Sequence, residues 1–145
     1  MGKQLISRIF FCICLAGTAC IASAGTGCES CFQRGQLYQG RGEYGAAIEA
    51  FQAAVQSDPD NALYHLWLAR GYGKLARQSE WTRAMSLATK TRRELEVAVV
   101  LDGENLDALT DLRDYYAEAP GFLGGSQEKA QQLDEEISRL NRVSN

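Results

Sequence analysis

The feature that most constrains the fold is one stretch of sequence, residues 28–61. Two segments with apolar residues at helical spacing flank Gly40–Gly42, so the stretch predicts two short helices joined by a tight turn. Gly35 lets the second helix approach the first closely, and Phe51 fills the gap between them. Pro59 biases the residue before it away from helix and ends the second segment. Such a unit buries its apolar face by stacking on others like it.

The pattern of this unit recurs twice along the chain. Tyr72 stands 34 residues after Tyr38, which places a second unit directly after the first. Tyr116 stands 44 residues after Tyr72, so the second unit holds 10 extra residues. We expect these residues in the turn of the second unit and in an N-terminal extension of its second helix, around residues 78–88. The expected helices cover about residues 29–39, 44–57, 61–76 and 78–101, a stretch around 109–116, and residues 127–141.

The first unit resembles the tetratricopeptide repeat (TPR), a helix–turn–helix motif of about 34 residues. The resemblance is carried by Gly35, Tyr38, Ala47, Phe51, Ala54 and Pro59. Cys31 and Arg34 stand where the motif prefers Trp and Leu, and the two later units follow it more loosely. Residues 83–105 and 115–130 also resemble a group of small exported bacterial TPR proteins. The resemblance implies an all-α fold of about three units, stacked as a short right-handed α-solenoid with an elongated second helix in the second repeat.

The N-terminal segment has the features of a signal peptide. Lys3 and Arg8 form a positive start, and the apolar run 9–19 that follows carries no charge. Residues 22–24 supply the small side chains that a signal peptidase recognises. We expect cleavage after Ala24 and an exported, periplasmic protein. The expected division is a signal peptide at residues 1–24 and a TPR domain at residues 25–145, with repeats at about 28–61, 62–105 and 106–141.

Two alternatives to cleavage remain open at this point. One is an uncleaved anchor, although the uncharged stretch is barely as long as the ~18–20 residues that a membrane span needs. The other is a lipid anchor, because residues 15–17 look like the start of a lipobox. Thr18 follows them where such a motif needs a cysteine. We therefore expect no membrane span in the mature chain.

The charge balance excludes some partners. The chain has 15 Lys and Arg residues against 18 Asp and Glu residues, and cleavage removes Lys3 and Arg8. An acidic chain lacks the basic patch that binds nucleic acid phosphates, and it is repelled by anionic lipid. We therefore predict a protein or peptide as the partner, and no nucleic acid.

A pair of cysteines, Cys28 and Cys31, begins the first helix. In an oxidising compartment such a pair can close a disulfide, and the alternatives are redox-active or partner-linking thiols, or no role. Phe32 stands where haem attachment needs a histidine, and His65 is the only histidine for a zinc site. We therefore predict no cofactor and no metal. His65 itself is expected to be a partly buried packing residue.

The TPR resemblance also implies a binding surface, because the first helix of each repeat lines a concave groove in that family. The groove positions by register are Phe32, Gln33, Gln36, Leu66, Trp67, Arg70, Asp107, Thr110, Asp111 and Asp114. Only Arg70 among them is basic, so we do not carry over the carboxylate clamp of chaperone-binding members. The groove is expected to be apolar in the middle and acidic at one end, which favours a partner with apolar and basic character. The alternative for Phe32, Leu66 and Trp67 is packing in the core.

The sequence thus predicts an exported TPR module that binds a protein or peptide and has no catalytic activity. The alternatives are an envelope redox protein that uses Cys28 and Cys31, and an oligomeric structural subunit of an envelope complex. The glycine-rich segment 119–126 is expected to be a helix-to-helix turn, because no strand precedes it and no Gly-Lys-Ser/Thr follows. We expect Phe122 to fold back onto the core, with exposure as a contact residue as the alternative.

Overall fold

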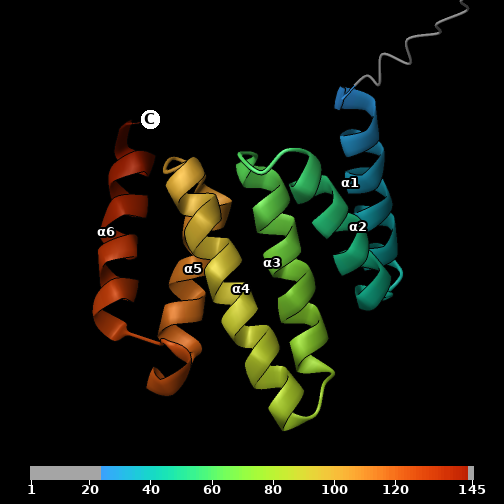
Figure 1. Cartoon of the computed structure of the whole chain (residues 1–145). Coiled ribbons are helices and arrows are strands. Elements are labelled where there is room, and N and C mark those ends of the chain that lie inside the picture. The colour runs from blue at the N-terminus through green and yellow to red at the C-terminus, as the bar shows by residue number, and fades with distance from the viewer. Residues whose placement is uncertain (1–23, 144–145) are drawn as a thin grey trace, which may run out of the picture.

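The computed structural model describes residues 24–143, with side chains from residue 29 onward. All but the last residue of the predicted signal peptide therefore lies outside the described part of the chain. The described residues form six α-helices and one short 3-10 turn, with no strand among them (Figure 1). Their bounds are α1 Ala24–Gly40, α2 Tyr44–Ser57, α3 Ala62–Arg77, α4 Trp81–Leu101, α5 Leu106–Glu118, η1 Gly121–Leu123 and α6 Gln127–Val143.

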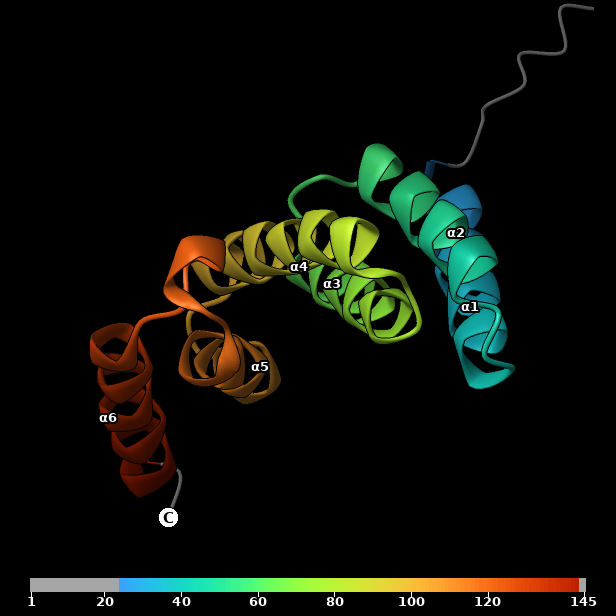
Figure 2. The same cartoon turned by 90° about the horizontal axis from the view of Figure 1, so that it is seen from below.

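The helices pack in consecutive antiparallel pairs, α1 with α2, α3 with α4 and α5 with α6 (Figure 1). Seen along the helices, the pairs follow an arc, with α3 and α5 on its inner side and α4 on its outer side (Figure 2). The predicted all-α architecture is confirmed. So is the elongated second helix of the second pair, because α4 has 21 residues and α2 has 14. No helix in residues 24–143 is long and apolar enough to span a bilayer.

Asparagine and serine side chains cap the N-termini of three of the helices. Asn61 Oδ1 accepts hydrogen bonds from the backbone amides of Leu63 and Tyr64, at 3.1 and 3.4 Å. Asn105 stands at the same place before α5, and its Oδ1 accepts from the amide of Ala108 at 3.1 Å. Before α6, Ser126 Oγ accepts from the amide of Lys129 at 3.3 Å, as the sequence predicts. Each cap pairs amides that the first turn of a helix leaves without a partner.

The first core cluster is built around Phe51, which is completely buried. Its ring lies 5.9 Å from that of Phe32 and 5.9 Å from that of Trp67, measured between centroids. Phe32 also lies 4.9 Å from the ring of Tyr64. A Cβ atom on Gly35 would lie 2.5 Å from two atoms of the Phe51 ring. The absence of a side chain at Gly35 therefore decides how closely α1 and α2 pack, as the sequence indicates.

The second core cluster joins the last two pairs of helices. Leu95 and Ala98 of α4 lie buried between residues of α3 and residues of α5. The remaining buried members of the cluster are Leu66, Ala69, Ala108, Leu112, Tyr116 and Ala130. Helix α4 therefore serves both as the partner of α3 and as the support on which α5 rests.

Backbone geometry fixes the turn between α5 and α6. A Cβ atom on Gly125 would lie 1.7 Å from the carbonyl oxygen of Ala119, and Gly124 has a φ of +91°, so both positions require glycine. Tyr115 Oη donates to the carbonyl of Leu123 at 2.9 Å. The turn is held through Leu123, and Phe122 next to it is 69% exposed. The expectation that Phe122 packs on the core is therefore wrong.

Tyr116 is a buried residue that couples α5 to α4 through its hydroxyl group. Its Oη donates to Glu96 Oε1 at 2.7 Å, and Arg92 Nη1 donates to the same oxygen at 2.7 Å. Burial, together with the nearby Glu96 carboxylate, raises the pKa of Tyr116 to about 12. The neutral phenol is therefore the form that the folded protein favours.

The contact between Gly35 and Phe51 leads to a first prediction. Gly35→Ala introduces a methyl group into the Phe51 ring, so we expect the free energy of unfolding to fall by about 1–3 kcal/mol. The matched control is Gly45→Ala in α2, where a Cβ meets no atom within 4 Å. That change should raise the free energy of unfolding by about 0.5–1 kcal/mol, because alanine favours helix over glycine. Urea denaturation measures both, and equal effects would contradict the packing described here.

Tyr116 leads to a second prediction. The pKa of this phenol is about 10 when unfolded and about 12 when folded, so the unfolded chain loses its proton first as the pH rises. The stabilisation is fully present below pH ~10 and is lost as the pH rises through ~12, by up to about 2–3 kcal/mol. Tyr116→Phe should remove most of this alkaline loss. Urea denaturation of both proteins between pH 9 and 12 tests it, and parallel pH profiles would rule it out.

Candidate functional site

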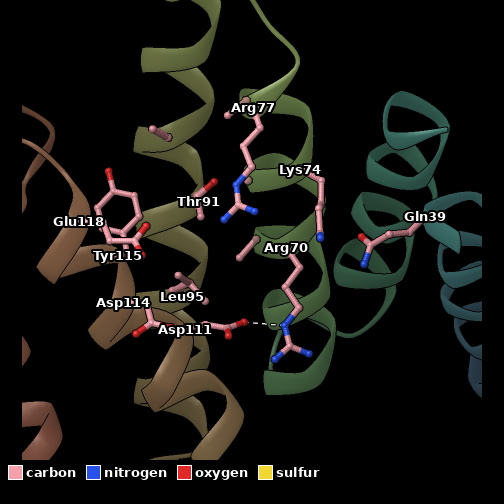
Figure 3. Close-up of a pocket in the computed structure, with 14 residues that line it drawn as sticks. Gln39, Arg70, Lys74, Arg77, Thr91, Leu95, Asp111, Asp114, Tyr115 and Glu118 are labelled. Carbon is pink, nitrogen blue, oxygen red and sulfur yellow. Dashed lines mark hydrogen bonds and ion pairs between the residues drawn. The ribbon is translucent and has the colours of Figure 1, made fainter. Parts of the chain in front are cut away.

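An open groove of about 580 Å³ lies on the inner side of the arc, between α3 and α5 (Figure 3). Helix α3 forms one wall, α5 forms the other, and α4 lies behind them as the floor. Gln39 reaches the edge of the groove from α1. Three of the four helices involved are first helices of their pairs, so the groove lies where the sequence predicts a binding surface.

The α3 wall is basic. Arg70, Lys74 and Arg77 are spaced four and three residues apart, so they lie along one face of the helix. Lys74 and Arg77 are exposed, and neither makes an ion pair within the described residues. In Figure 3, Arg77 lies over Thr91 and Lys74 lies on the side towards Gln39. Two cations on this wall are therefore available to a ligand.

The α5 wall is acidic. Asp111, Asp114 and Glu118 are spaced three and four residues apart and lie opposite the α3 cations (Figure 3). Asp114 and Glu118 are exposed. Asp114 Oδ1 lies 3.2 Å from Nε of its neighbour Arg113, and Glu118 makes no ion pair in the part of the chain that the structure describes. The two walls thus carry opposite charges.

Small residues line the bottom of the groove. They are Ala69 and Gly73 at the base of the α3 wall and Ala88 on the α4 floor, next to Thr91 and Leu95 of α4. Thr91 Oγ1 donates to the carbonyl of Leu87 at 3.0 Å within its own helix, which leaves an acceptor on that oxygen. A ligand backbone can therefore come close to α4 along this floor.

An ion pair crosses the groove at one end. Arg70 Nε lies 2.5 Å from Asp111 Oδ2, and Arg70 Nη2 lies 3.2 Å from Asp107 Oδ2. The Arg70 guanidinium also lies 5.8 Å from the centre of the Trp67 ring. Burial lowers the pKa of Arg70, but the two aspartates more than offset it, so the pKa is raised above its usual value. Arg70 is therefore charged and bound to α5, and this ion pair closes one end of the groove.

The structure brings together only part of the predicted site. Arg70, Asp111 and Asp114 line the groove, and Asp107 joins it through its ion pair with Arg70. Gln36 and Thr110 are half-buried and Gln33 is exposed, but none of the three lines the groove. Gln33 Nε2 instead donates to Glu29 Oε1 at 2.8 Å along α1.

The apolar part of the predicted site belongs to the core. Phe32 is 6% exposed and Leu66 is 1% exposed, so neither presents a surface to a ligand. Trp67 is half-buried, and its ring lies against Phe32 and Phe51. These three side chains pack in the core, which is the alternative to a groove position. The curvature of the arc turns these faces of α1 and α3 towards the neighbouring helices.

The predicted charge pattern is also incomplete. Lys74, Arg77 and Glu118 line the groove but are missing from the sequence-based set. Their signal is present in the sequence, because Lys74 and Arg77 follow Arg70 by four and seven residues on the same helix face. Glu118 follows Asp111 by seven residues in the same way. The groove is therefore not acidic at one end with an apolar middle, but basic along one wall and acidic along the other.

Only one cysteine of the predicted pair has a described side chain. Cys31 carries no disulfide among the described residues, and its Sγ accepts a hydrogen bond from Arg34 Nη2 at 3.4 Å. The side chain of Cys28 lies outside the described part of the chain, so a bond between the two cysteines stays a prediction. Within residues 29–143, no group of three His, Cys, Asp or Glu side chains is placed to hold a metal ion.

His65 is 7% exposed, as the prediction of a packing residue requires. Its Nδ1 lies 2.7 Å from Glu94 Oε2, and its Nε2 lies 2.9 Å from the carbonyl oxygen of Pro59. The ring thus ties the turn before α3 to the middle of α4. This role is structural, and it helps hold α4 behind the groove.

Comparison with known proteins identifies the fold. Residues 35–75 match the family model of the TPR repeat. Among solved structures, the second TPR domain of Spaghetti (RPAP3), bound to the HSP90 peptide SRMEEVD, is similar to this chain with a TM-score of 0.63. The two are 23% identical, and the match covers 79% of this chain and 93% of that one. The chain has the fold of a TPR solenoid. No curated protein shows significant sequence similarity to it.

The cross-groove ion pair leads to a third prediction. Arg70 and Asp111 are each about 30% exposed, so their pairing should be stronger than that of a surface pair. In a double-mutant cycle of Arg70→Gln and Asp111→Asn, we expect a coupling free energy of about 1 kcal/mol or more that falls as salt is added. The exposed pair Glu136 and Arg139 serves as control and should couple more weakly. Coupling indistinguishable from zero for Arg70 and Asp111 would show that the groove is not closed at this end.

Proposed function

We propose that this chain is an exported protein-interaction module that binds a peptide or protein segment in the groove between α3 and α5, without catalysis of its own. The observation that carries the proposal is the groove itself. It is open, lies on the inner face of a TPR solenoid, and exposes Lys74, Arg77 and Glu118 without ion-pair partners among the described residues.

Two further observations support a binding role. The similar TPR domain of Spaghetti (RPAP3) is bound to a peptide, which is the class of ligand proposed for this chain. The exposed groove residues Lys74, Arg77 and Glu118 also belong to neither core cluster. Side chains that contribute nothing to the core yet converge on one hollow favour recognition of a ligand.

Export rests on the sequence alone. The positive start, the apolar run and the small residues before Gly25 are the features of a cleaved signal peptide. A periplasmic module would meet its partner in the envelope, and the predicted bond between Cys28 and Cys31 would then brace the beginning of α1.

Site-specific cross-linking provides the fourth prediction. Benzoylphenylalanine is introduced into the full chain at Lys74 or at Glu118, both exposed at the rim of the groove. Controls carry it at Glu49 or Arg83, which are exposed on α2 and on α4 at a second hollow outside the groove. After irradiation in the native cell, we expect one protein adduct from both groove positions and none from the controls. The adduct should be recovered from the exported fraction of the cell. Mass spectrometry should show that this chain begins at Gly25 in the adduct.

A choice of variants makes the test specific. Trp67→Ala is unsuitable because the ring packs against Phe32 and Phe51, so loss of binding would follow from loss of structure. Lys74→Ala with Arg77→Ala removes two exposed side chains and should abolish the adduct formed at Glu118 while leaving the circular dichroism spectrum unchanged. Equal adducts from groove and control positions would disprove the binding role of the groove, and recovery of an uncleaved chain from the cytoplasm would disprove export.

A further inference from the structure

The length of the walls sets how much of a ligand the groove can contact. From Arg70 to Arg77 the α3 wall rises by about 10 Å, at 1.5 Å per residue. The groove along it is open and has a volume of about 580 Å³. About three or four residues of an extended segment match the length of the wall.

The small residues at the bottom of the groove favour an extended ligand. An extended backbone resting on the small residues Ala69, Gly73 and Ala88 sends successive side chains to opposite sides. Alternate side chains of the ligand therefore face α3, and those between them face α5. Positions two residues apart in an extended chain are about 6.6 Å apart. The rise from Lys74 to Arg77 is about 4.5 Å and that from Asp114 to Glu118 is about 6 Å, so one ligand side chain can meet each protein charge.

The walls then decide the charge of each side. Lys74 and Arg77 lie on α3 without ion-pair partners among the described residues, whereas Asp114 and Glu118 lie on α5 (Figure 3). A uniformly acidic segment would place half of its carboxylates against Asp114 and Glu118, and a uniformly basic one would meet Lys74 and Arg77. Only a segment with acids on one side and bases on the other satisfies both walls.

We propose that the groove recognises an extended peptide segment in which acidic and basic side chains alternate, with the acids towards Lys74 and Arg77 and the bases towards Asp114 and Glu118. This inference rests on the proposed function and specifies the ligand of the same groove. The ion pair between Arg70 and Asp111 sets where the segment stops. It crosses the groove, and each of its two charges is already neutralised by the other.

Four labelled octapeptides with blocked ends test the proposal by fluorescence anisotropy against the full chain. One alternates Glu and Lys, and a second has the same composition in the order Glu-Glu-Lys-Lys, which mixes the charges on both sides. The others are all Glu and all Lys. At low salt we expect the alternating peptide to bind about tenfold more tightly than its isomer, since misplacing two ion pairs costs a few-fold each. This ratio should shrink in 0.5 M salt.

Variants of the walls should redirect the preference. Lys74→Glu with Arg77→Glu makes both walls acidic and should favour the all-Lys peptide, whereas Asp114→Lys with Glu118→Lys should favour the all-Glu peptide. The control Arg41→Glu with Arg83→Glu changes the net charge by the same amount as the first variant, at exposed residues that do not line the groove. It should keep the alternating preference. If a wall variant does not fold, Lys74→Gln with Arg77→Gln replaces it and should reduce the preference for the alternating isomer, because only Asp114 and Glu118 then distinguish the two peptides.

The inference is overturned if the two isomers bind equally to the wild-type chain, if the all-Glu or all-Lys peptide binds most tightly, if no peptide binds, or if the control variant switches preference as the wall variants do. None of these results affects the proposed function, which depends on adducts formed at Lys74 and Glu118. Conversely, alternating preference without any such adduct in the cell would support the chemistry of the groove and leave the proposed function without support.

Discussion

The inner face of this solenoid depends on the burial of Leu95 and Ala98 of α4 between α3 and α5. Leu95 is 2% exposed and also lines the groove, so one side chain belongs to both the core and the floor. Replacing a buried leucine of this kind by alanine typically costs about 2–5 kcal/mol. The separation of the two walls is therefore fixed by core packing. His65 reinforces it by joining α4 to the turn before α3, and Tyr116 does so by joining α4 to α5.

On this rigid support, the charges of the groove fall into two classes. At one end, Arg70 and Asp111 neutralise each other across the gap, and Asp107 adds a second carboxylate to the same guanidinium. Towards the other end, Lys74, Arg77 and Glu118 are exposed and make no ion pair within the described residues, and Asp114 is exposed although it pairs with its neighbour Arg113. The first class holds α3 to α5, and the second class is available to a ligand. The same helix faces thus serve stability at one end and recognition at the other.

Much of the fold follows from the sequence because helical spacing and register are local. The match of Tyr38, Tyr72 and Tyr116 locates the three pairs, and Gly35 with Phe51 predicts the close packing of the first pair. The site is harder to predict because the curvature of the arc decides which helix faces are covered. That curvature buries Phe32 and Leu66 and leaves Lys74 and Arg77 facing the groove. Contacts such as His65 with Glu94 join residues 29 positions apart and leave no local signal.

The central claim is that the groove between α3 and α5 is the binding surface of this chain. An NMR titration of the labelled protein with the alternating Glu-Lys peptide tests it most directly. The account predicts that the amide signals of Lys74, Arg77, Thr91 and Glu118 shift with one common affinity. The signals of residues at the second hollow, which lies between α2 and α4 and outside the groove, should not shift. Shifts confined to Gly45, Glu49 and Arg83, which line the second hollow, would contradict the claim that the groove is the binding surface.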